Sequence, residues 1–245
     1  MEELEKTRKI VKTSFFIAVV TVAVLLVFPY DMKPKEWGIY ASSYFVTTLG
    51  LTVGGAAIGI LLGMLLAFLK FQKTNIEILD MIKDVIIDEY VDIMRGTPMV
   101  LQLLTLSFVV VILNNYWIAL IALGLNSAAY VEETIRSGIE SIDKGQMEAA
   151  RATGMPYRMA MNEIIMPQAI KNILPALLNE FINLFKETAV VGYISVVDIT
   201  MNSKSLQAVY YSVKPILFTG LVYYISVKLF SFIGKRLEMR LKEND

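Results

Sequence analysis

The chain of 245 residues contains no cysteine and no histidine. The missing cysteine excludes disulfides, iron–sulfur clusters and thiolate nucleophiles. The missing histidine removes the commonest metal ligand and the usual acid–base group at neutral pH, which rules out a serine–histidine triad. The sequence therefore predicts no catalytic residues, no metal site and no cofactor, and any covalent chemistry linked to this chain is expected to belong to another protein.

Charged residues are also scarce, and the positive and negative charges are equal in number. They make up 19% of the chain and hydrophobic residues 56%, against about a quarter and about 45–50% in an average soluble protein. Lys and Arg number 23 and Asp and Glu number 23, so the chain lacks the basic field that nucleic-acid binding requires. With a mean hydropathy of +0.56, this composition predicts a polytopic membrane protein built from helices.

Long apolar runs predict six helices that cross the membrane. A crossing helix needs about 20 mostly apolar residues. The first run follows a basic segment, as in a signal peptide, but it ends at Pro29 and Tyr30 without a small-residue cleavage site, so we expect an uncleaved helix. The expected helices are 13–30, 44–69, 97–113, 116–136, 171–200 and 214–235.

Two patterns predict how helices pack. Gly55, Gly59 and Gly63 share one helix face, where small residues allow another helix to approach closely. Residues 70–95 place apolar side chains at helical spacing between charged ones, which predicts an amphipathic helix with an apolar stripe toward the bundle. The expected stripe consists of Ile78, Met81, Ile82, Val85, Ile86 and Tyr90.

Basic residues are divided unequally between the two sides of the membrane. If the N-terminus is cytoplasmic, the inner segments hold 17 of the 23 Lys and Arg residues, the outer segments hold four, and two lie within spans. Because short cytoplasmic loops are enriched in Lys and Arg, we expect a multi-pass protein of the cell membrane with both termini in the cytoplasm. The four outer residues are Lys33, Lys35, Lys204 and Lys214.

The longest expected cytoplasmic loop contains a short helix with defined ends. Asp143 can cap its first amides, Gly154 suits a left-handed C-terminal position, and Pro156 favours the start of a second helix. That second helix is expected to run to Ile165, where Pro167 interrupts it. The first helix carries small alanines on its surface, so it suits insertion into a groove of a partner.

Residues in this loop resemble the EAA motif of the membrane-spanning subunits of ABC importers. Met166 departs from the family, which usually has Leu there, but it keeps the volume and apolarity. Three other segments resemble the polar amino acid permeases of this group, and the resemblance covers about residues 40–235. The motif consists of Glu148-Ala149-Ala150, Gly154, Ile164, Met166 and Pro167. The three other segments are 95–103, which begins with Arg95-Gly96-Thr97-Pro98, then 126–139, and finally Lys186-Glu187-Thr188.

The resemblance implies the permease subunit of an ATP-driven amino acid importer. Its fold class would be an all-α, polytopic transmembrane bundle with a five-helix importer core and one extra N-terminal helix. The implied domains are 1–36, the cytoplasmic N-terminus and extra helix; 37–235, the transmembrane domain with a coupling loop at about 140–170; and 236–245, a cytoplasmic tail.

The resemblance also implies partners. Two cytoplasmic ATPase subunits would receive the loop helix, a second permease subunit would complete a homodimer or heterodimer, and an extracellular binding protein would deliver the amino acid. The chain itself has no G-x-x-x-x-G-K-[ST] sequence, so it is not expected to be an enzyme. The lipid bilayer around the transmembrane helices is the remaining expected partner. The residues implied in ATPase coupling are Gly145, Glu148, Ala149, Ala150, Gly154 and Pro156.

Polar residues on the helix at 171–200 form a candidate substrate pathway. Charges inside a bilayer cost roughly a few kcal/mol and tend to face the bundle interior or water. Lys186 can meet the carboxylate of an amino acid, and Glu180 or Glu187 its ammonium group. Alternatively, Lys186 pairs with a group on its own helix and only stabilises the bundle. The candidate pathway residues are Asn179, Glu180, Asn183, Lys186, Glu187, Gln102 and Asn126.

The expected mechanism is alternating access, driven by ATP binding and hydrolysis in the partner subunits. Two other classes stay open. An ion-coupled secondary transporter would use the same polar residues for ion coupling, and a membrane scaffold or sensor would not transport at all. Only the ATP-driven importer predicts copurifying ATPases and substrate-stimulated hydrolysis.

Overall fold

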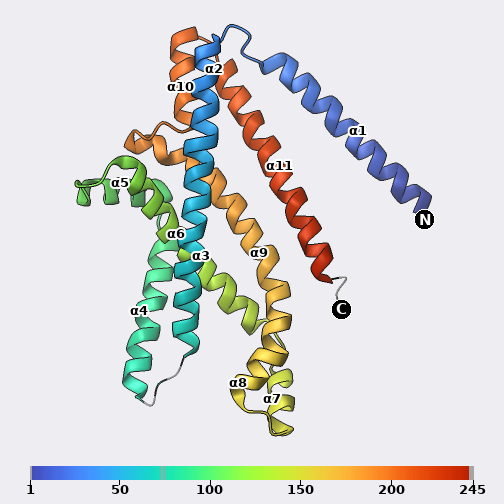
Figure 1. Cartoon of the computed structure of the whole chain (residues 1–245), viewed down its shortest axis with the longest axis vertical. Coiled ribbons are helices and arrows are strands. Elements are labelled where there is room, and N and C mark those ends of the chain that lie inside the picture. The colour runs from blue at the N-terminus through green and yellow to red at the C-terminus, as the bar shows by residue number, and fades with distance from the viewer. Residues whose placement is uncertain (1, 73, 75, 243–245) are drawn as a thin grey trace.

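The computed structural model describes residues 2–72, 74 and 76–242, and within these ranges it contains helices but no β-strand (Figure 1). This confirms the all-α class. Lys73, one of the basic residues counted on the inner side, and the last three residues of the expected tail lie outside the described residues. The α-helices are α1 (Glu2–Val27), α2 (Pro34–Ser42), α3 (Leu49–Phe71), α4 (Glu77–Gly96), α5 (Met99–Val109), α6 (Asn115–Glu140), α7 (Lys144–Ala152), α8 (Tyr157–Ala160), α9 (Met166–Glu187), α10 (Ile199–Tyr210) and α11 (Lys214–Lys242), joined in places by the π-helical turns η1 (Ser43–Thr48) and η2 (Met161–Ile165) and the 3₁₀ turn η3 (Thr188–Ile194).

Four of the described helical segments are long and apolar enough to cross a membrane. One of them joins α2, η1 and α3 into 38 continuous residues. Helix α9 carries the polar residues and an internal proline, Pro175, and it packs between α6 and α11. The arrangement is consistent with a five-helix core and one extra helix. The four segments are Glu3–Val27, Pro34–Phe71, Asn115–Glu140 and Lys214–Arg240.

The expected crossing at 97–113 differs from the structure. Helix α5 has 11 residues, which gives a length of about 16 Å, whereas the hydrocarbon core is about 30 Å thick. Thr97 has extended backbone (φ −116°, ψ 141°), as a residue before proline prefers, and this separates α5 from α4. The helix in this segment is therefore shorter than the predicted 97–113.

Helices α3 and α6 form the centre of the bundle through the predicted glycine face. A Cβ added to Gly59 would lie 2.7 Å from Ser127 Cβ, and one added to Gly63 would lie 2.6 Å from Val131 Cβ. The Gly63 position would also meet the backbone oxygen of Ala128 at 2.7 Å. The missing side chains therefore allow close approach of the two helices, which confirms the predicted packing role.

Helix α4 is amphipathic, as expected, but most of its apolar face points away from the bundle. The side chains that pack on Ala129 of α6 include the buried Ile87 and Val91. Tyr90 is partly buried there, and its hydroxyl donates to the Leu125 carbonyl oxygen (2.6 Å). The prediction for the other stripe residues is wrong, because lipid can cover an apolar helix face as well as protein can. The exposed ones are Ile78, Met81, Ile82, Val85 and Ile86.

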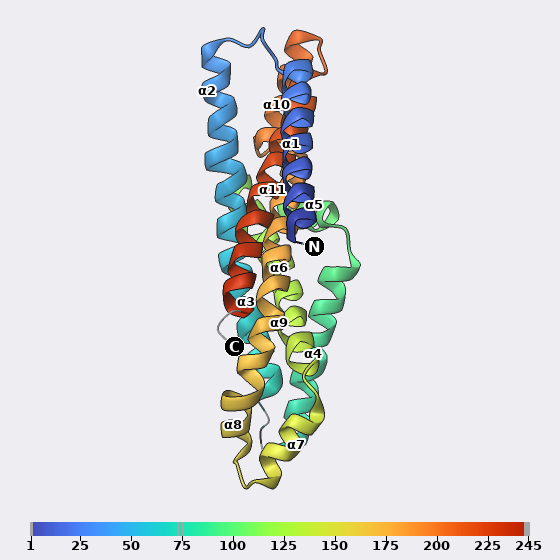
Figure 2. The same cartoon turned by 90° about the vertical axis from the view of Figure 1, so that its right-hand side faces the viewer.

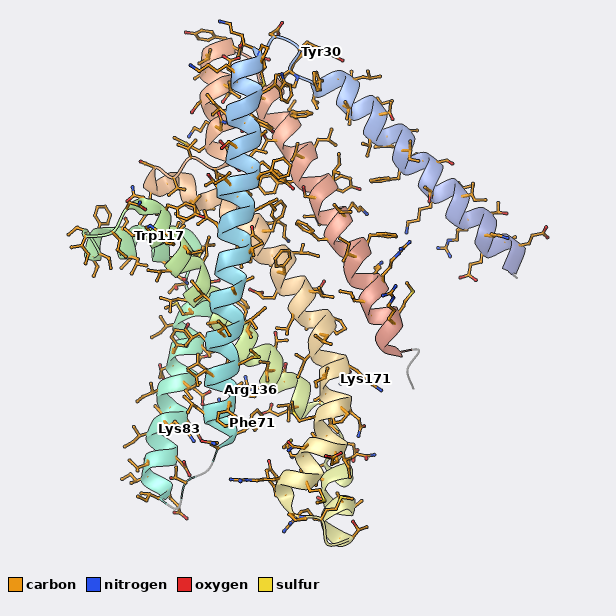
Figure 3. The ribbon with its side chains drawn as sticks, viewed as in Figure 1. Tyr30, Phe71, Lys83, Trp117, Arg136 and Lys171 are labelled. Carbon is orange, nitrogen blue, oxygen red and sulfur yellow. The ribbon has the colours of Figure 1, made fainter. Side chains whose placement is uncertain are left out.

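The N-terminal half of α4 instead directs charged groups toward the end of α3. Lys83 of α4 lies near Phe71, and its ammonium group donates to the Gln72 carbonyl oxygen (Figure 3). The Thr74 amide donates to both Asp80 carboxylate oxygens, at 2.8 and 3.1 Å. Partial burial of Asp80 opposes its ionisation, but the hydrogen bonds from Thr74 and Lys83 outweigh this and lower the pKa of the carboxyl. Polar contacts thus join α3 and α4 here.

Helix α1 diverges from the rest of the bundle and contacts α11 (Figures 1 and 2). Near its C-terminal end, the ring of Phe28 stacks on Trp37 with a centroid distance of 5.2 Å. Farther along, Lys228 Nζ of α11 lies 5.9 Å from the ring centroid of Phe16 and 5.5 Å from that of Tyr224. Aromatic and cation–π contacts therefore attach this additional helix to the core.

The two ends of the molecule are built from different elements. Helix α10 and the connection from α1 to α2 lie at one end, and α7 and α8 lie at the other (Figures 1 and 2). The start of α1 and the end of α11 are both directed toward the α7–α8 end (Figure 1). Both helices therefore extend from the α10 end of the bundle toward the α7–α8 end.

Candidate functional site: an exposed loop helix and a charged cavity

The loop helix predicted from its end residues is present as α7. The Asp143 carboxylate accepts a hydrogen bond from the Gly145 amide (2.7 Å), and Gly154 has left-handed backbone with φ of 88°. Ala150 is buried, and α7 packs on the neighbouring η2 turn. The other coupling candidates form an accessible surface at one end of the molecule. They are Gly145, Glu148, Ala149, Gly154 and Pro156.

The helix after this loop has different limits from those expected. Pro156 precedes α8, with extended backbone (φ −59°, ψ 149°), and is not its first residue. The helical path then continues through η2 into α9, and Pro167 lies in the first turn of α9. The predicted interruption at Pro167 is wrong. We attribute the continuity to the π-helical turn, which accommodates the ring and the missing N–H of proline.

A cavity of about 330 Å³ lies between α6, α9 and η3. Four of the seven candidate pathway residues line it, all of them from α9. Glu180 is the most deeply placed, with 9% of its surface exposed, and the Ser127 side chain of α6 hydrogen-bonds to it. Two carboxylates and one ammonium group therefore share one cavity. The lining residues are Tyr130, Glu180, Asn183, Lys186, Glu187 and Val190.

The other candidate pathway residues are not part of this lining. Asn179 is exposed on α9 next to Glu180. The Gln102 side-chain amide of α5 donates to the Met94 (2.7 Å) and Thr97 (3.0 Å) carbonyl oxygens. The Asn126 amide of α6 donates to Met94 (3.1 Å) and to the Gln102 side-chain oxygen (3.1 Å). Gln102 and Asn126 thus satisfy backbone carbonyls at the C-terminal end of α4.

Lys186 has no carboxylate within ion-pair distance among the residues that the structure describes. The alternative in which it pairs with an acid on its own helix is therefore not seen. Two lining residues, Tyr130 and Val190, were missed by sequence reasoning. Tyr130 lies one turn after Asn126 and one turn before Glu133 on α6. It is uncharged, so nothing in the sequence indicated a role in the cavity. Its proximity to α9 comes from tertiary packing.

Ion pairs surround the C-terminal half of α6, the helix on which Figure 3 labels Trp117 and Arg136. The Arg95 guanidinium at the end of α4 pairs with Glu133 and lies over the Tyr130 ring, with Cζ 5.5 Å from the centroid. Arg136 lies 3.9 Å from Glu133 and also approaches two other glutamates of α6. These are Glu132 at 3.7 Å, with 1% of its side chain exposed, and Glu140 at 3.3 Å.

A membrane helix bundle with a charged cavity between long helices and an exposed, capped helix at one end defines the permease subunit of a transporter. The chain belongs to the family of binding-protein-dependent transport system inner membrane components, which matches residues 59–243. A permease of this family is not an enzyme, and ATP hydrolysis belongs to a separate subunit. The family predicted from the EAA motif is confirmed.

Similar proteins of known or assigned transport systems cover most of the chain. The arginine transport system permease protein ArtQ of Bacillus subtilis is 43% identical over 204 residues, which are 81% of this chain and 90% of the relative. The putative glutamine transport system permease protein GlnP of Rickettsia conorii is 37% identical over 225 residues, which are 89% of this chain and all of the relative.

Solved structures agree with this assignment. An amino acid ABC transporter solved with histidines aligns with a TM-score of 0.75 and 36% identity, over 84% of this chain and 95% of that chain. The methionine ABC transporter MetNI in an inward-facing conformation aligns with a TM-score of 0.71 and 18% identity, over 86% of this chain and 99% of that chain. The second likeness supports the fold alone.

Proposed function

We propose that this chain is the permease subunit of an ATP-driven amino acid importer and that the cavity between α6 and α9 receives the amino acid during transport. The observation that carries the proposal is the presence of carboxylates and an ammonium group in one cavity. Lys186 can bind the carboxylate of an amino acid while Glu180 or Glu187 binds its ammonium group. The named substrates of the relatives, arginine and glutamine, support this substrate class.

The excess of acidic over basic groups favours a cationic amino acid. When one carboxylate binds the substrate ammonium group, the other remains for a positively charged side chain. A neutral amino acid would leave that carboxylate without a partner in a partly buried place, which is unfavourable. We therefore expect arginine or lysine to be transported in preference to glutamine, in line with the arginine permease among the relatives.

A second permease subunit is proposed to complete the cavity. Asn179, Asn183 and Lys186 are exposed on the single chain. Polar groups in membrane helices tend to face protein or a water-filled space, not lipid. A second copy of this chain, or a related permease, would cover this side of α9 and enclose the substrate between two subunits.

Helix α7 is proposed to couple the cavity to two cytoplasmic ATPases. Its exposed surface, with Glu148 and Ala149, is suited to a groove of one ATPase, and the same helix of the second permease subunit would bind the other. On the other side α7 packs on η2, which continues directly into α9 and its cavity residues. Displacement of α7 on ATP binding can therefore move α9 and change access to the cavity. Such coupling requires each ligand to bind the two access states with different affinity.

The orientation proposed from the basic residues agrees with this arrangement. The α7–α8 end would lie in the cytoplasm with both chain termini, and the α10 end would face an extracellular binding protein. In that orientation the outer end would hold Lys33 and Lys35 beside the start of α2, Lys204 of α10 and Lys214 at the start of α11.

The cavity is tested by uptake of radiolabelled arginine into vesicles that contain the complete transporter, coexpressed with its ATPase and supplied with its binding protein. Lys186→Ala and Glu180→Gln are each expected to raise the KM at least about tenfold, because each removes a charge-assisted contact. Lys228→Ala is the matched control, since it removes a lysine from a membrane helix outside the cavity, and its KM should stay within about twofold of wild type. Unchanged KM in Lys186→Ala and Glu180→Gln would refute the cavity assignment.

The same vesicles distinguish the rival functions. An ATP-driven importer takes up arginine only with internal ATP, and hydrolysis rises when the loaded binding protein is added. Uptake driven by an ion gradient without ATP would instead identify a secondary transporter. A complex without ATPase and without uptake would favour a membrane scaffold.

A further inference from the structure

Arg95 contacts a cavity residue without belonging to the cavity lining. Its guanidinium carbon lies 5.5 Å from the centroid of the Tyr130 ring, which is the distance range of a cation–π interaction. Tyr130 is the residue through which α6 contributes to the described cavity lining. Arg95 also pairs with Glu133, one helical turn from Tyr130 on α6. The same side chain thus contacts two successive turns of α6.

The backbone that carries Arg95 is held in place by side chains of two other helices. Gln102 of α5 donates to the carbonyl oxygens on both sides of Arg95, those of Met94 and Thr97. Asn126 of α6 donates to the same Met94 oxygen and to the Gln102 side chain. The Gln102 bonds join the end of α4 to α5, and the Asn126–Met94 bond joins it to α6. The backbone at Arg95 is therefore held in place while its side chain contacts Tyr130.

A lysine would make the same pair of contacts less well. The planar guanidinium can stack on an aromatic face while its N–H groups bind a carboxylate at the side. An ammonium group is a point charge and has no plane to place on the ring. The Arg95 guanidinium makes both kinds of contact, one with the ring of Tyr130 and one with the carboxylate of Glu133.

We infer that Arg95 is a positioning residue for substrate binding, which fixes the Tyr130 ring as a wall of the cavity without touching the substrate. This inference rests on the proposed function of the cavity. When Arg95 is removed, Tyr130 gains rotational freedom, and substrate binding must restrict it again. The loss is therefore expected in the KM for uptake, with little change in the maximal rate.

The test compares Arg95→Gln, Arg95→Lys and Tyr130→Ala in arginine uptake by the complete transporter in ATP-loaded vesicles. Arg95→Gln should raise the KM about fivefold, since a cation–π contact of this kind has a modest energy, and the maximal rate should stay within about twofold. Arg95→Lys should fall between wild type and Arg95→Gln. The double variant Arg95→Gln/Tyr130→Ala should have the KM of Tyr130→Ala alone, because the two residues act as one unit.

Arg136→Gln is the matched control for a structural role. Arg136 shares Glu133 with Arg95, and its other recorded ion-pair partners are Glu132 and Glu140. Arg136→Gln should lower the thermal stability of the complex and leave the KM unchanged. If Arg95→Gln behaves in the same way, Arg95 only joins α4 to α6 and the inference is overturned. Multiplicative effects in the double variant would also overturn it.

Glu180→Gln in the same assay separates this inference from the proposed function. If Glu180→Gln raises the KM and Arg95→Gln does not, the cavity assignment stands and the positioning role of Arg95 is refuted. If Glu180→Gln also leaves the KM unchanged, the cavity is not the binding site and both proposals fail.

Discussion

Three glycines on α3 occupy positions where α6 leaves little space for a side chain. Gly63 is the most restricted of them, because an added carbon would meet both a side chain and the backbone oxygen of Ala128, at 2.7 Å. Backbone cannot rotate aside as a flexible side chain can. Gly220 on α11 is different, since no heavy atom lies within 4 Å of the added position. The same residue type is therefore required at one site and not at the other.

Gly63→Ala is expected to destabilise the protein by about 1–3 kcal/mol, because the added methyl group forces α3 and α6 apart. The measurement is the Tm of the purified complex in detergent. Gly220→Ala is the control, and it should leave the Tm unchanged or raise it slightly because alanine favours helix. Equal Tm values for wild type and Gly63→Ala would contradict the close helix contact.

Asn126 and Gln102 show that a polar residue inside the bundle can serve to bind backbone carbonyl oxygens of a neighbouring helix instead of substrate. Asn126 is 3% exposed and donates to the end of α4. Asn126→Ala leaves the Met94 oxygen with fewer donors, so we expect a loss of about 1–2 kcal/mol in stability. The KM for uptake should stay within about twofold of wild type, because Gln102 still donates to the Met94 oxygen and keeps the backbone beside Arg95 in place. Thermal unfolding and uptake kinetics are measured on the same preparation. A raised KM with normal stability would instead return Asn126 to the substrate pathway.

Among the elements, α4 and α7 both carry surfaces that the rest of the chain does not cover. The outward apolar face of α4 suits lipid, whereas the outward face of α7 is polar and small and suits a protein groove. Helix α7 is defined by its two ends, with Asp143 as the N-terminal cap and Gly154 in left-handed backbone after its last turn. The shape of the surface proposed to bind the ATPase therefore depends on the backbone conformation at Gly154.

Gly154→Val and Gly154→Asn separate this backbone effect from crowding, because no heavy atom lies within 4 Å of a Cβ added at Gly154. Valine should strain the left-handed backbone by roughly 1–2 kcal/mol and distort the end of α7, while asparagine tolerates this conformation better. We expect reduced copurification of the ATPase and reduced uptake with valine, and near-normal values with asparagine. Identical behaviour of the two variants would show that the conformation at Gly154 is unimportant for coupling.

The whole molecule has a cytoplasmic and an outer end in the proposed orientation, and the absence of cysteine makes this orientation directly measurable. Single cysteines can be introduced into the chain without removing any native thiol. Lys204 of α10 and Arg158 of α8 are exposed and lie at opposite ends.

In intact cells, a membrane-impermeant thiol reagent is expected to label Lys204→Cys and not Arg158→Cys. After permeabilisation both should react. The physical reason is the bilayer itself, which a charged reagent cannot cross. Labelling is measured by a mass shift on a gel. The reverse pattern would invert the topology, and it would place the α7 surface away from cytoplasmic ATPases.

Local patterns were sufficient for the helical class, the glycine contact and the ends of α7. Each of these depends on properties of a short segment: apolar length, small residues on one face, or a capping side chain beside the amides that it satisfies. The same local information located the charged residues of α9, since Glu180, Lys186 and Glu187 are conspicuous in an apolar helix. The motif of the coupling loop then indicated the family.

Local patterns could not predict what each helix face contacts. Helical periodicity shows which residues share a face, but an apolar face is satisfied equally by lipid and by protein, so the direction of α4 was predicted wrongly. Tyr130 joined Glu180 and Lys186, and Asn126 turned toward α4, only through the packing of α6 against its neighbours. These contacts join residues far apart along the chain, and the free energy that selects among them is a property of the assembled bundle.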